Sequence, residues 1–298
     1  MTYQEAYQKA TGELKAAGIP EPESDAWILL EHVTGMTRTR YYVDGFERMP
    51  KNEEDRFFEL VSCRKTRIPV QHLTGVQEFM GYEFAVNEHV LVPRQDTEIL
   101  VEEAEKRLLL MKKENPVKVL DMCTGSGCIL LSLLLELPQA LGTGVDVSEG
   151  ALCVAKENRK RLGLEQRAEL IQSDLFSADY FQKNSGNDHM EYDMLISNPP
   201  YIRTEDIEGL MEEVRFHDPV LALDGKENGL YFYEKITEQA GTYLKPGGWL
   251  MYEIGCDQGM DVSEIMKKNG FEQIEIKKDL AGLDRVVTGR KMQEEQNV

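Results

Sequence analysis

The chain has 298 residues, of which 41% are hydrophobic and 29% are charged, a globular composition that excludes a disordered or collagen-like chain. Its length suits two domains. It carries 53 acidic against 34 basic residues, and no stretch approaches the roughly 18 apolar residues that a membrane span needs.

The N-terminus, cysteines and histidines indicate the compartment. Charged residues interrupt the apolar positions of the first twenty residues, so we do not expect a signal peptide. Five cysteines without a CxxC spacing predict neither a disulfide framework nor a zinc site, and the five histidines show no ligand spacing. We therefore expect a soluble cytoplasmic protein without a metal.

The first 72 residues predict a small helical bundle. Thr2 and Glu5 match a capping box at the start of a helix that a glycine and a proline close. Apolar residues at helical spacing predict a second helix over Ser24–Val33. Asn52 is placed to cap a third helix. We expect residues 1–72 to form a domain of their own.

Residues 73–93 change in character. Aromatic and β-branched residues separated by turn signals predict short strands in a hairpin, with Val90 and Val92 in the last of them. A long amphipathic helix to about Lys113 follows. We expect this β-hairpin connector to lead into a second domain over residues 94–298.

From Val117 onward strands and helices alternate, which is typical of a doubly wound, mainly parallel α/β sheet. The predicted strands are Val117–Asp121, Gly142–Val147, Glu169–Ser173, Tyr192–Ser197 and Trp249–Gly255, and the predicted helices are Cys128–Leu137, Glu149–Leu162, Asn228–Leu244 and Asp261–Asn269. Phe271–Lys278 and Arg285–Arg290 are joined by a short turn and therefore predict an antiparallel pair at the end of the chain. Residues 182–190 predict a mobile surface loop.

The first candidate binding site is the glycine loop Asp121–Gly127, after the first of these strands. Its glycines let the chain turn sharply and bring backbone N–H groups to a ligand at a helix N-terminus. A dinucleotide fingerprint needs a third small residue where this chain has Leu130, so a pyrophosphate site is disfavoured. Asp121 fits better beside a cationic part of a ligand. A tight turn without a ligand remains the alternative.

Acidic residues end two further strands. Asp146 can accept hydrogen bonds from both hydroxyls of a ribose, although alone it would more often cap the following helix. Asp174 offers a carboxylate for an adenine amino group, while Leu175 and Phe176 offer apolar surface for the ring. Capping of the next turn is the alternative for Asp174.

The sharpest signal is Asn198-Pro199-Pro200-Tyr201, at the end of the fourth strand. Two successive prolines remove two N–H donors, so the loop presents two acceptors, the Asn198 side-chain oxygen and the Pro199 carbonyl. Adjacent acceptors match the two hydrogens of a planar –NH2 group, on which the ring of Tyr201 can pack. Drawing both hydrogens toward acceptors lets the nitrogen lone pair point at an electrophile.

These motifs together resemble a class I S-adenosylmethionine-dependent methyltransferase that methylates amino groups. Four segments are more specific and are similar to the release factor glutamine methyltransferases, the PrmC or HemK family. They are PRQDTE (Pro93–Glu98), NPPYI (Asn198–Ile202), DPVLALDGKENGL (Asp218–Leu230) and LKPGGWLMYEIGCDQG (Leu244–Gly259). The resemblance implies a Rossmann-like sheet. It also implies methyl transfer from S-adenosylmethionine to the side-chain amide nitrogen (N5) of the glutamine in the Gly-Gly-Gln motif of class-1 peptide chain release factors.

The resemblance further implies roles for individual residues. The cofactor-binding residues would be Thr97, Asp121, Thr124, Gly125, Gly127, Asp146, Asp174, Leu175 and Asn198. The substrate-binding residues would be Asn198, Pro199, Pro200 and Tyr201, of which Asn198, Pro199 and Tyr201 would be catalytic. Two positions depart from the family pattern: Asp218 stands where Glu is usual, and Lys226 stands where Gly is usual. Both departures put contacts of a substrate-side loop in doubt.

Two other functions stay open at this point: an N6-adenine methyltransferase acting on nucleic acid, and a non-catalytic cofactor-binding interaction module. A methyltransferase that acts on nucleic acid needs a basic face to bind the phosphate backbone. Residues 1–75 hold ten basic and twelve acidic residues, which leaves twenty-four basic and forty-one acidic residues for the rest. The complete Asn-Pro-Pro-Tyr set argues against the second. We expect the bundle to dock an acidic surface of a release factor through Arg64, Lys65 and Arg67, without a nucleic-acid or membrane partner.

Overall fold

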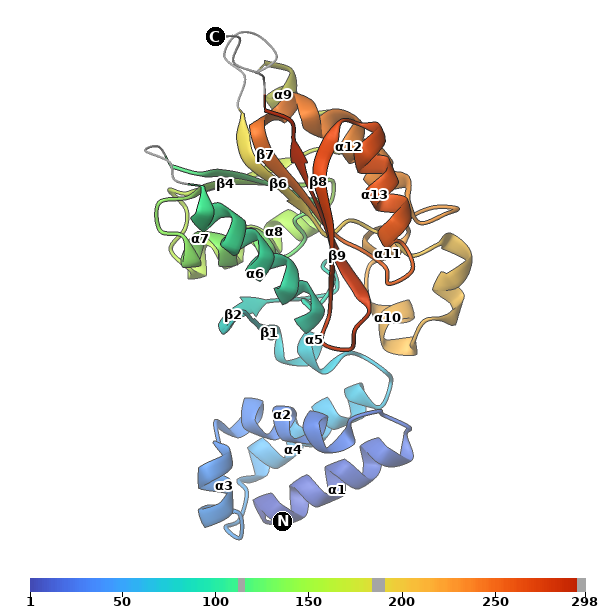
Figure 1. The fold of residues 1–298 in the computed structure, drawn as a ribbon. Coiled ribbons are helices and arrows are strands. Elements are labelled where there is room, and N and C mark those ends of the chain that lie inside the picture. Colours follow the sequence, from blue (N-terminus) through green and yellow to red (C-terminus); the bar gives the residue numbers. More distant parts are fainter. Residues whose placement is uncertain (112–115, 184–190, 294–298) are drawn as a thin grey trace. The chain divides into compact units, whose positions relative to one another are not determined.

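The computed structural model of the protein describes residues 1–111, 116–183 and 191–293 (Figure 1). The predicted surface loop therefore lies, from residue 184 on, outside the described residues, as does the predicted helix end at Lys113. The chain forms two compact units. Unit 1 consists of Met1–Val76 and Met211–His217, and unit 2 consists of Gln77–Leu210 and Asp218–Val298.

Unit 1 is a helical bundle around one apolar core. Its helices are α1 (Tyr3–Ala16), α2 (Pro22–Thr34), α3 (Arg38–Asp44), α4 (Lys51–Arg64), α5 (Val70–Thr74) and α10 (Glu212–His217). The capping box of Thr2 and Glu5 at the start of α1 is confirmed. The predicted cap at Asn52 is wrong, because α4 begins at Lys51, after Pro50, and no described side chain caps it. The fixed φ of Pro50 (−54°) already directs the chain into the helix.

The basic cluster at the end of α4, which was predicted to dock a partner, forms ion pairs within unit 1. Arg64 is only 5% exposed, and its guanidinium pairs with Asp25 at 2.7 Å and with Glu213 at 3.0 Å. Arg67 pairs with the same Glu213 at 3.2 Å, and Lys65 pairs with an acid of α1 at 2.9 Å. These cations are neutralised inside unit 1, partly by the short α10, so they leave little charge for a partner.

The connector is shorter than predicted. Only β1 (Val76–Phe79) and β2 (Tyr82–Ala85) form the two-stranded sheet. Val90 and Val92, expected in a strand, lie in an irregular segment, where both are buried. The side chain of Asn87 accepts a hydrogen bond from the backbone N–H of His89 at 2.9 Å, so the chain turns instead of extending.

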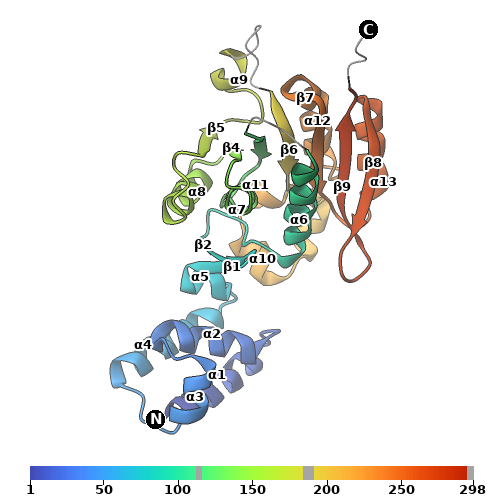
Figure 2. The same ribbon diagram turned by 60° about the vertical axis from the view of Figure 1, so that its left-hand side comes forward.

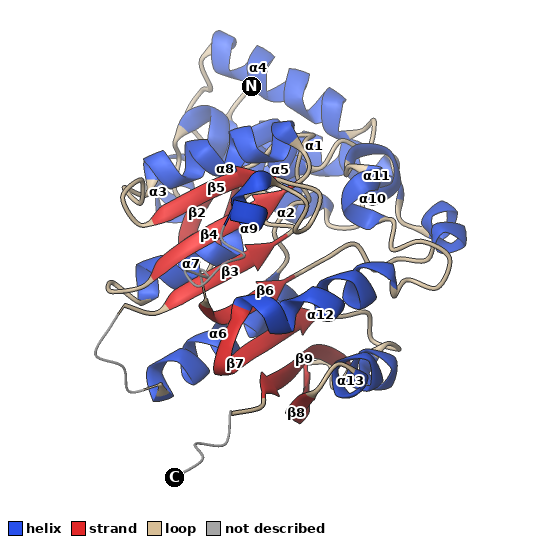
Figure 3. Cartoon of the chain, turned by 90° about the horizontal axis from the view of Figure 1, so that it is seen from above, coloured by secondary structure: helices blue, strands red, loops and turns tan. Residues whose placement is uncertain are grey.

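Unit 2 contains a seven-stranded sheet in the order β5-β4-β3-β6-β7-β9-β8, which can be followed in Figure 3. Figure 2 shows β9 and β8 side by side at one end of this sheet. The strands are β3 (Lys118–Met122), β4 (Leu141–Asp146), β5 (Ala168–Gln172), β6 (Tyr192–Ser197), β7 (Leu244–Glu253), β8 (Phe271–Lys278) and β9 (Asp284–Lys291). The first five are parallel, and β9 runs antiparallel to both β7 and β8. The predicted fold class is confirmed.

Helices cover both faces of this sheet. One apolar cluster includes buried residues of α6 (Gln95–Leu110) and α7 (Cys128–Glu136), and a second includes those of α12 (Tyr231–Tyr243) and α13 (Gly259–Lys268). The remaining helical segments are α8 (Glu149–Arg161), α9 (Asp179–Lys183), α11 (Val220–Leu223) and the 3-10 helix η1 (Thr204–Gly209). Among the described residues, no helix is long and apolar enough to span a membrane.

The strand order places a crevice at the carboxyl end of β3. The chain passes from β3 to β4 on one side of β3 and returns to β6 on its other side. Loops that follow β3 and β6 therefore leave the sheet in opposite directions, and ligands of open α/β sheets bind at this switch point.

Candidate active site

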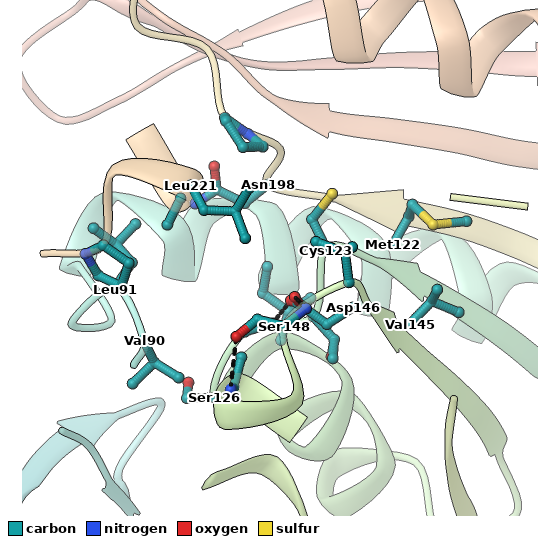
Figure 4. Close-up of a pocket in the computed structure, with 18 of the residues that line it drawn as sticks. Val90, Leu91, Met122, Cys123, Ser126, Val145, Asp146, Ser148, Asn198 and Leu221 are labelled. Atoms are coloured by element: carbon teal, nitrogen blue, oxygen red, sulfur yellow. Dashed lines mark hydrogen bonds between the residues drawn. The ribbon is translucent and has the colours of Figure 1, made fainter. Parts of the chain in front are cut away.

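A cavity of about 260 Å³ lies at this switch point, close to the lower end of the volumes usual for small-molecule sites. Figure 4 shows Asn198 and Leu221 across the cavity from Asp146 and Ser148. Of the predicted site residues, its lining includes Thr97, Thr124, Gly125, Asp146, Asp174, Leu175, Asn198 and Pro200. Asp121, Gly127, Pro199 and Tyr201 do not line it. The structure thus brings eight of the predicted residues, from separate loops, around one space.

The glycine loop after β3 is held by hydrogen bonds from its backbone N–H groups to the end of β4. The N–H of Thr124 donates to the Val145 carbonyl at 2.9 Å, and the N–H of Gly125 donates to the Asp146 carboxylate at 2.9 Å. Gly125 has a φ of 56°, a left-handed conformation that glycine adopts without strain. Cys123, which also lines the cavity, has a φ of 61° without being glycine. Strained backbone of this kind gathers at functional sites.

Asp146 joins the two strand ends. One carboxylate oxygen accepts from Gly125, and the other accepts from the N–H of Ser148 at 2.9 Å. Ser148, and not Asp146, caps α8. Burial raises the pKa of the Asp146 carboxyl, partly offset by these N–H groups. A carboxylate has about four acceptor positions, so this one keeps capacity for hydroxyl groups of a ligand.

Asp121 lies behind the glycine loop. It is fully buried, and one of its oxygens accepts from the Thr124 hydroxyl at 2.6 Å. The other has no hydrogen-bond partner within the described ranges, and burial raises the pKa of this carboxyl to about 7. Asp121 therefore positions Thr124 rather than forming part of the cavity wall.

The segment after β5 contributes only part of what was predicted. Asp174 is exposed and Leu175, at a φ of 50°, is half-buried, and both line the cavity. Phe176 does not offer its ring to a ligand there, because it is buried and stacks on Tyr243 with ring centroids 4.6 Å apart. The apolar lining on this side comes from Leu175 and Val147.

The Asn-Pro-Pro-Tyr loop borders the cavity through Asn198 and Pro200. The amide nitrogen of Asn198 lies 3.5 Å from the hydroxyl oxygen of Thr97 on α6. Tyr201 is directed elsewhere: its hydroxyl donates to Glu253 at 3.4 Å, and its carbonyl accepts from the side chain of Gln258 at 3.0 Å. The loop is thus held from β7 and the turn that follows it.

Two stretches of cavity wall were not predicted. The first precedes α6 and the second follows α10, and both contribute apolar and polar lining: His89, Val90, Leu91, Pro93, Arg94, Pro219, Leu221 and Ala222. An ion pair connects them, since the Arg94 guanidinium lies 3.0 Å from the buried carboxylate of Asp218. The other Asp218 oxygen has no partner in the described part of the chain, and burial raises the pKa of this carboxyl to about 6. Only the PRQDTE and DPVLALDG segments could have indicated this wall.

In the DPVLALDGKENGL segment, the close approach of the backbone at position 225 requires a glycine. A Cβ at Gly225 would lie 2.7 Å from both the Cα and the carbonyl carbon of Tyr201, closer than real Cβ atoms approach. The next residue, Lys226, has a φ of 69°. The family pattern noted above has Gly at this position, so this chain holds a lysine where the backbone suits glycine.

Replacing Lys226 by glycine is expected to raise the free energy of unfolding by about 0.5–1 kcal/mol, because a left-handed non-glycine residue costs roughly 1–2 kcal/mol. The loss of the exposed Lys226–Asp224 ion pair, 2.9 Å long, offsets little of this gain. Denaturant unfolding of the two proteins measures the difference. Lys226→Ala, which keeps the Cβ, is the control and should give no gain. A less stable glycine variant would contradict this account.

The family resemblance implies that Asp146 holds the ribose of the cofactor. On that prediction, replacing Asp146 by alanine is expected to raise the cofactor Kd about tenfold or more, because charge-assisted hydrogen bonds contribute roughly 1.5–3 kcal/mol. The variant also frees the N–H groups of Gly125 and Ser148, so Asp146→Asn, which keeps the side-chain shape, separates lost charge from a loosened loop. Calorimetry with S-adenosylmethionine measures both. An unchanged Kd in both variants would place ribose recognition elsewhere.

Comparison with known proteins identifies both parts of the chain. Residues 5–75 match the PrmC N-terminal domain, and residues 113–295 match a methyltransferase domain family. The chain is 38% identical to the release factor glutamine methyltransferase of Clostridium acetobutylicum, over 96% of this chain and 98% of that protein. It is 39% identical to the enzyme of the same name from Agrobacterium fabrum, over 93% of each chain.

Solved structures agree on the fold. The methyltransferase domain described as "delta-N METTL16 MTase domain" superposes with a TM-score of 0.51 at 16% identity, over 71% of this chain and 89% of that one. The Thermus thermophilus 16S rRNA N2 G1207 methyltransferase, solved with AdoMet and guanosine, gives a TM-score of 0.50 at 16% identity, over 72% of this chain and 49% of that one. By its sequence over nearly its whole length, this chain belongs to the release factor glutamine methyltransferase family.

Proposed function

We propose that this protein transfers a methyl group from S-adenosylmethionine to the N5 nitrogen of the glutamine in the Gly-Gly-Gln motif of class-1 peptide chain release factors. One observation carries the proposal beyond family membership. The Asn198 side chain and Pro200 border the same cavity as the glycine loop and Asp146, so an amide held at the loop faces a cofactor held between β3 and β4.

The cavity suits S-adenosylmethionine. Asp146 and Asp174 are acids among mainly apolar lining residues, a setting that favours ribose hydroxyls and a cationic sulfonium over a pyrophosphate. The Asp146 carboxylate would hold the ribose, and Asp174 with Leu175 would hold the adenine. Gly125 would lie against the cofactor through its backbone, and the Thr97 end of α6 would close over the methionine part.

The chain's own groups position the nitrogen rather than remove a proton first. When bound, S-adenosylmethionine supplies a methyl group that the positive sulfur already activates. The Asn198 side-chain oxygen and the Pro199 carbonyl would accept the two amide hydrogens and fix the plane of the substrate amide. That alignment directs the nitrogen lone pair along the line of transfer. Within the described ranges, no cluster of His, Cys, Asp or Glu could hold a metal ion.

We further propose that unit 1 docks the release factor, because a lone glutamine offers too little surface to select one protein. Arg64 and Arg67 are engaged inside the unit, but the unit also exposes large apolar side chains. Tyr42, Val43 and Phe46, on and just after α3, are 78%, 74% and 75% exposed. Exposed apolar patches of this kind mark interaction sites. We place the reaction in the cytoplasm, the compartment of translation.

The proposal is tested by incubating the full chain with methyl-labelled S-adenosylmethionine and a purified class-1 release factor, and by locating the label with mass spectrometry. We expect one methyl group on the Gly-Gly-Gln glutamine. A duplex DNA or an RNA offered in place of the factor should remain unlabelled. Label on nucleic acid, or no label on the glutamine, would contradict the proposed substrate.

A further inference from the structure

A buried carboxyl lies directly beside the Asn-Pro-Pro-Tyr loop. Glu253 is the last residue of β7 and is 3% exposed. Ser197 of β6 pairs with Tyr252 of β7, so the register places Glu253 beside Asn198. Glu253 does not line the cavity, and no step of the proposed reaction uses it.

This carboxyl connects two residues that the reaction needs. One of its oxygens accepts from the Tyr201 hydroxyl at 3.4 Å. The other has no hydrogen-bond partner in the described part of the chain. The Thr97 hydroxyl lies near this carboxyl and lowers its pKa. The Thr97 oxygen is in turn 3.5 Å from the amide nitrogen of Asn198.

The direction of these hydrogen bonds follows from the charge of Glu253. An ionised carboxylate can only accept, so the Tyr201 hydroxyl donates to it, and the nearby Thr97 hydroxyl can approach it only as a donor. The Thr97 oxygen is then an acceptor for the Asn198 –NH2 group. An asparagine amide can rotate to exchange its nitrogen and oxygen, and its neighbours decide between the two orientations. With its nitrogen at Thr97, Asn198 presents its oxygen to the cavity, where the substrate amide needs an acceptor.

We propose that Glu253 is a positioning residue of this enzyme, which fixes the orientation of the Asn198 amide through Thr97 and holds Tyr201 directly. The inference rests on the proposed amide methylation. A glutamine at position 253 has nearly the same shape but carries a donor. Its amide nitrogen can donate to the Thr97 oxygen, which leaves the Thr97 hydroxyl free to donate to Asn198 and so allows the opposite orientation of the Asn198 amide.

The surroundings of Glu253 make this role depend on pH. Burial is the main reason why its pKa is raised to about 7, and Asp96 on α6 raises it further. Arg285 on β9 and the hydroxyls of Thr97 and Tyr201 lower it. Below pH 7 the carboxyl gains a proton and can itself donate, so it no longer fixes the direction of the hydrogen bonds of Thr97 and Asn198. The rate at saturating substrates should therefore fall as the pH decreases through about 7.

The test compares four variants of the full chain in methyl transfer to intact release factor. We expect Glu253→Gln to lower kcat about tenfold or more, with the substrate KM and the cofactor Kd within about twofold of the wild-type values. Thr97→Val should show the same loss, whereas Thr97→Ser, which keeps the hydroxyl, should retain most of the rate. Glu103→Gln is the matched control, because Glu103 is a partly buried acid of α6 that pairs with Arg107 at 2.7 Å.

The pH profile separates positioning from a structural role. Wild-type kcat should show an acidic limb near pH 7 that is absent in Glu253→Gln. A wild-type rate in Glu253→Gln, an unchanged acidic limb, or a loss matched by weaker cofactor binding and a lower melting temperature would overturn the inference. A wild-type enzyme that does not label the glutamine would overturn the proposed function, and this inference with it.

Discussion

Asn198→Ala is expected to lower kcat about a hundredfold or more and to leave the cofactor Kd within about threefold of the wild-type value. Asn198 borders the cavity, and its nitrogen is directed to Thr97, so its oxygen is available for the substrate amide. The lost acceptor acts on the substrate during transfer. The loss should therefore appear in kcat at saturating cofactor.

The measurement combines single-turnover methyl transfer with calorimetric titration of S-adenosylmethionine. Asn198→Asp is an informative comparison, since it keeps an oxygen toward the cavity but places a second carboxylate near buried Glu253. We expect it to be impaired as well, with a pH dependence that differs from that of the wild type. If Asn198→Ala lost cofactor binding along with activity, Asn198 would be a cofactor residue and not the amide acceptor.

The sheet could be predicted because its signals are local. Apolar runs alternate with loops and helical segments along this part of the chain, and the predicted bounds of β6 and β8 match the structure. The antiparallel end followed from the short turn between β8 and β9. The glycine loop and the acid at the end of β4 were found for the same reason: the carboxyl ends of parallel strands meet at one edge.

The pairing of α4 with α10 could not be predicted. Arg64 and Glu213 are 149 residues apart in sequence, and nothing local indicates that a segment within the second half of the chain belongs to unit 1. A charge count shows that cations are present but not which ones are neutralised internally. The sequence therefore did not indicate that the basic cluster forms ion pairs within unit 1.

The buried carboxyl of Glu253 was not predicted as part of the site for a related reason. Glu253 reads as the end of a strand, and its importance depends on Thr97 and Tyr201, which reach it from α6 and from the loop after β6. Likewise Phe176 follows Asp174 in sequence, yet its ring belongs to the apolar core. Sequence patterns place residues at a strand end, but the direction of each side chain depends on packing between elements distant in sequence.

The second large effect is expected when exposed apolar side chains of unit 1 are replaced. Tyr41 anchors α3 on the bundle, with its ring 5.3 Å from that of Trp27, while the exposed Tyr42, Val43 and Phe46 contribute little to the core of unit 1. Replacing these three should therefore leave the bundle folded. Burial of a large apolar side chain against a partner contributes roughly 1.5–3 kcal/mol, before the costs of binding reduce it.

We expect the combined variant Tyr42→Gln, Val43→Gln and Phe46→Gln to lower kcat/KM for intact release factor between about tenfold and a hundredfold. Its rate on a short Gly-Gly-Gln peptide and its affinity for S-adenosylmethionine should not change, because neither involves unit 1. The matched control is Leu109→Gln with Leu110→Gln on α6, which removes side chains that are 64% and 82% exposed in unit 2. Initial rates with the intact release factor and with the peptide measure both effects. If the combined variant methylates the intact factor as fast as the wild type, the apolar face of α3 does not dock it.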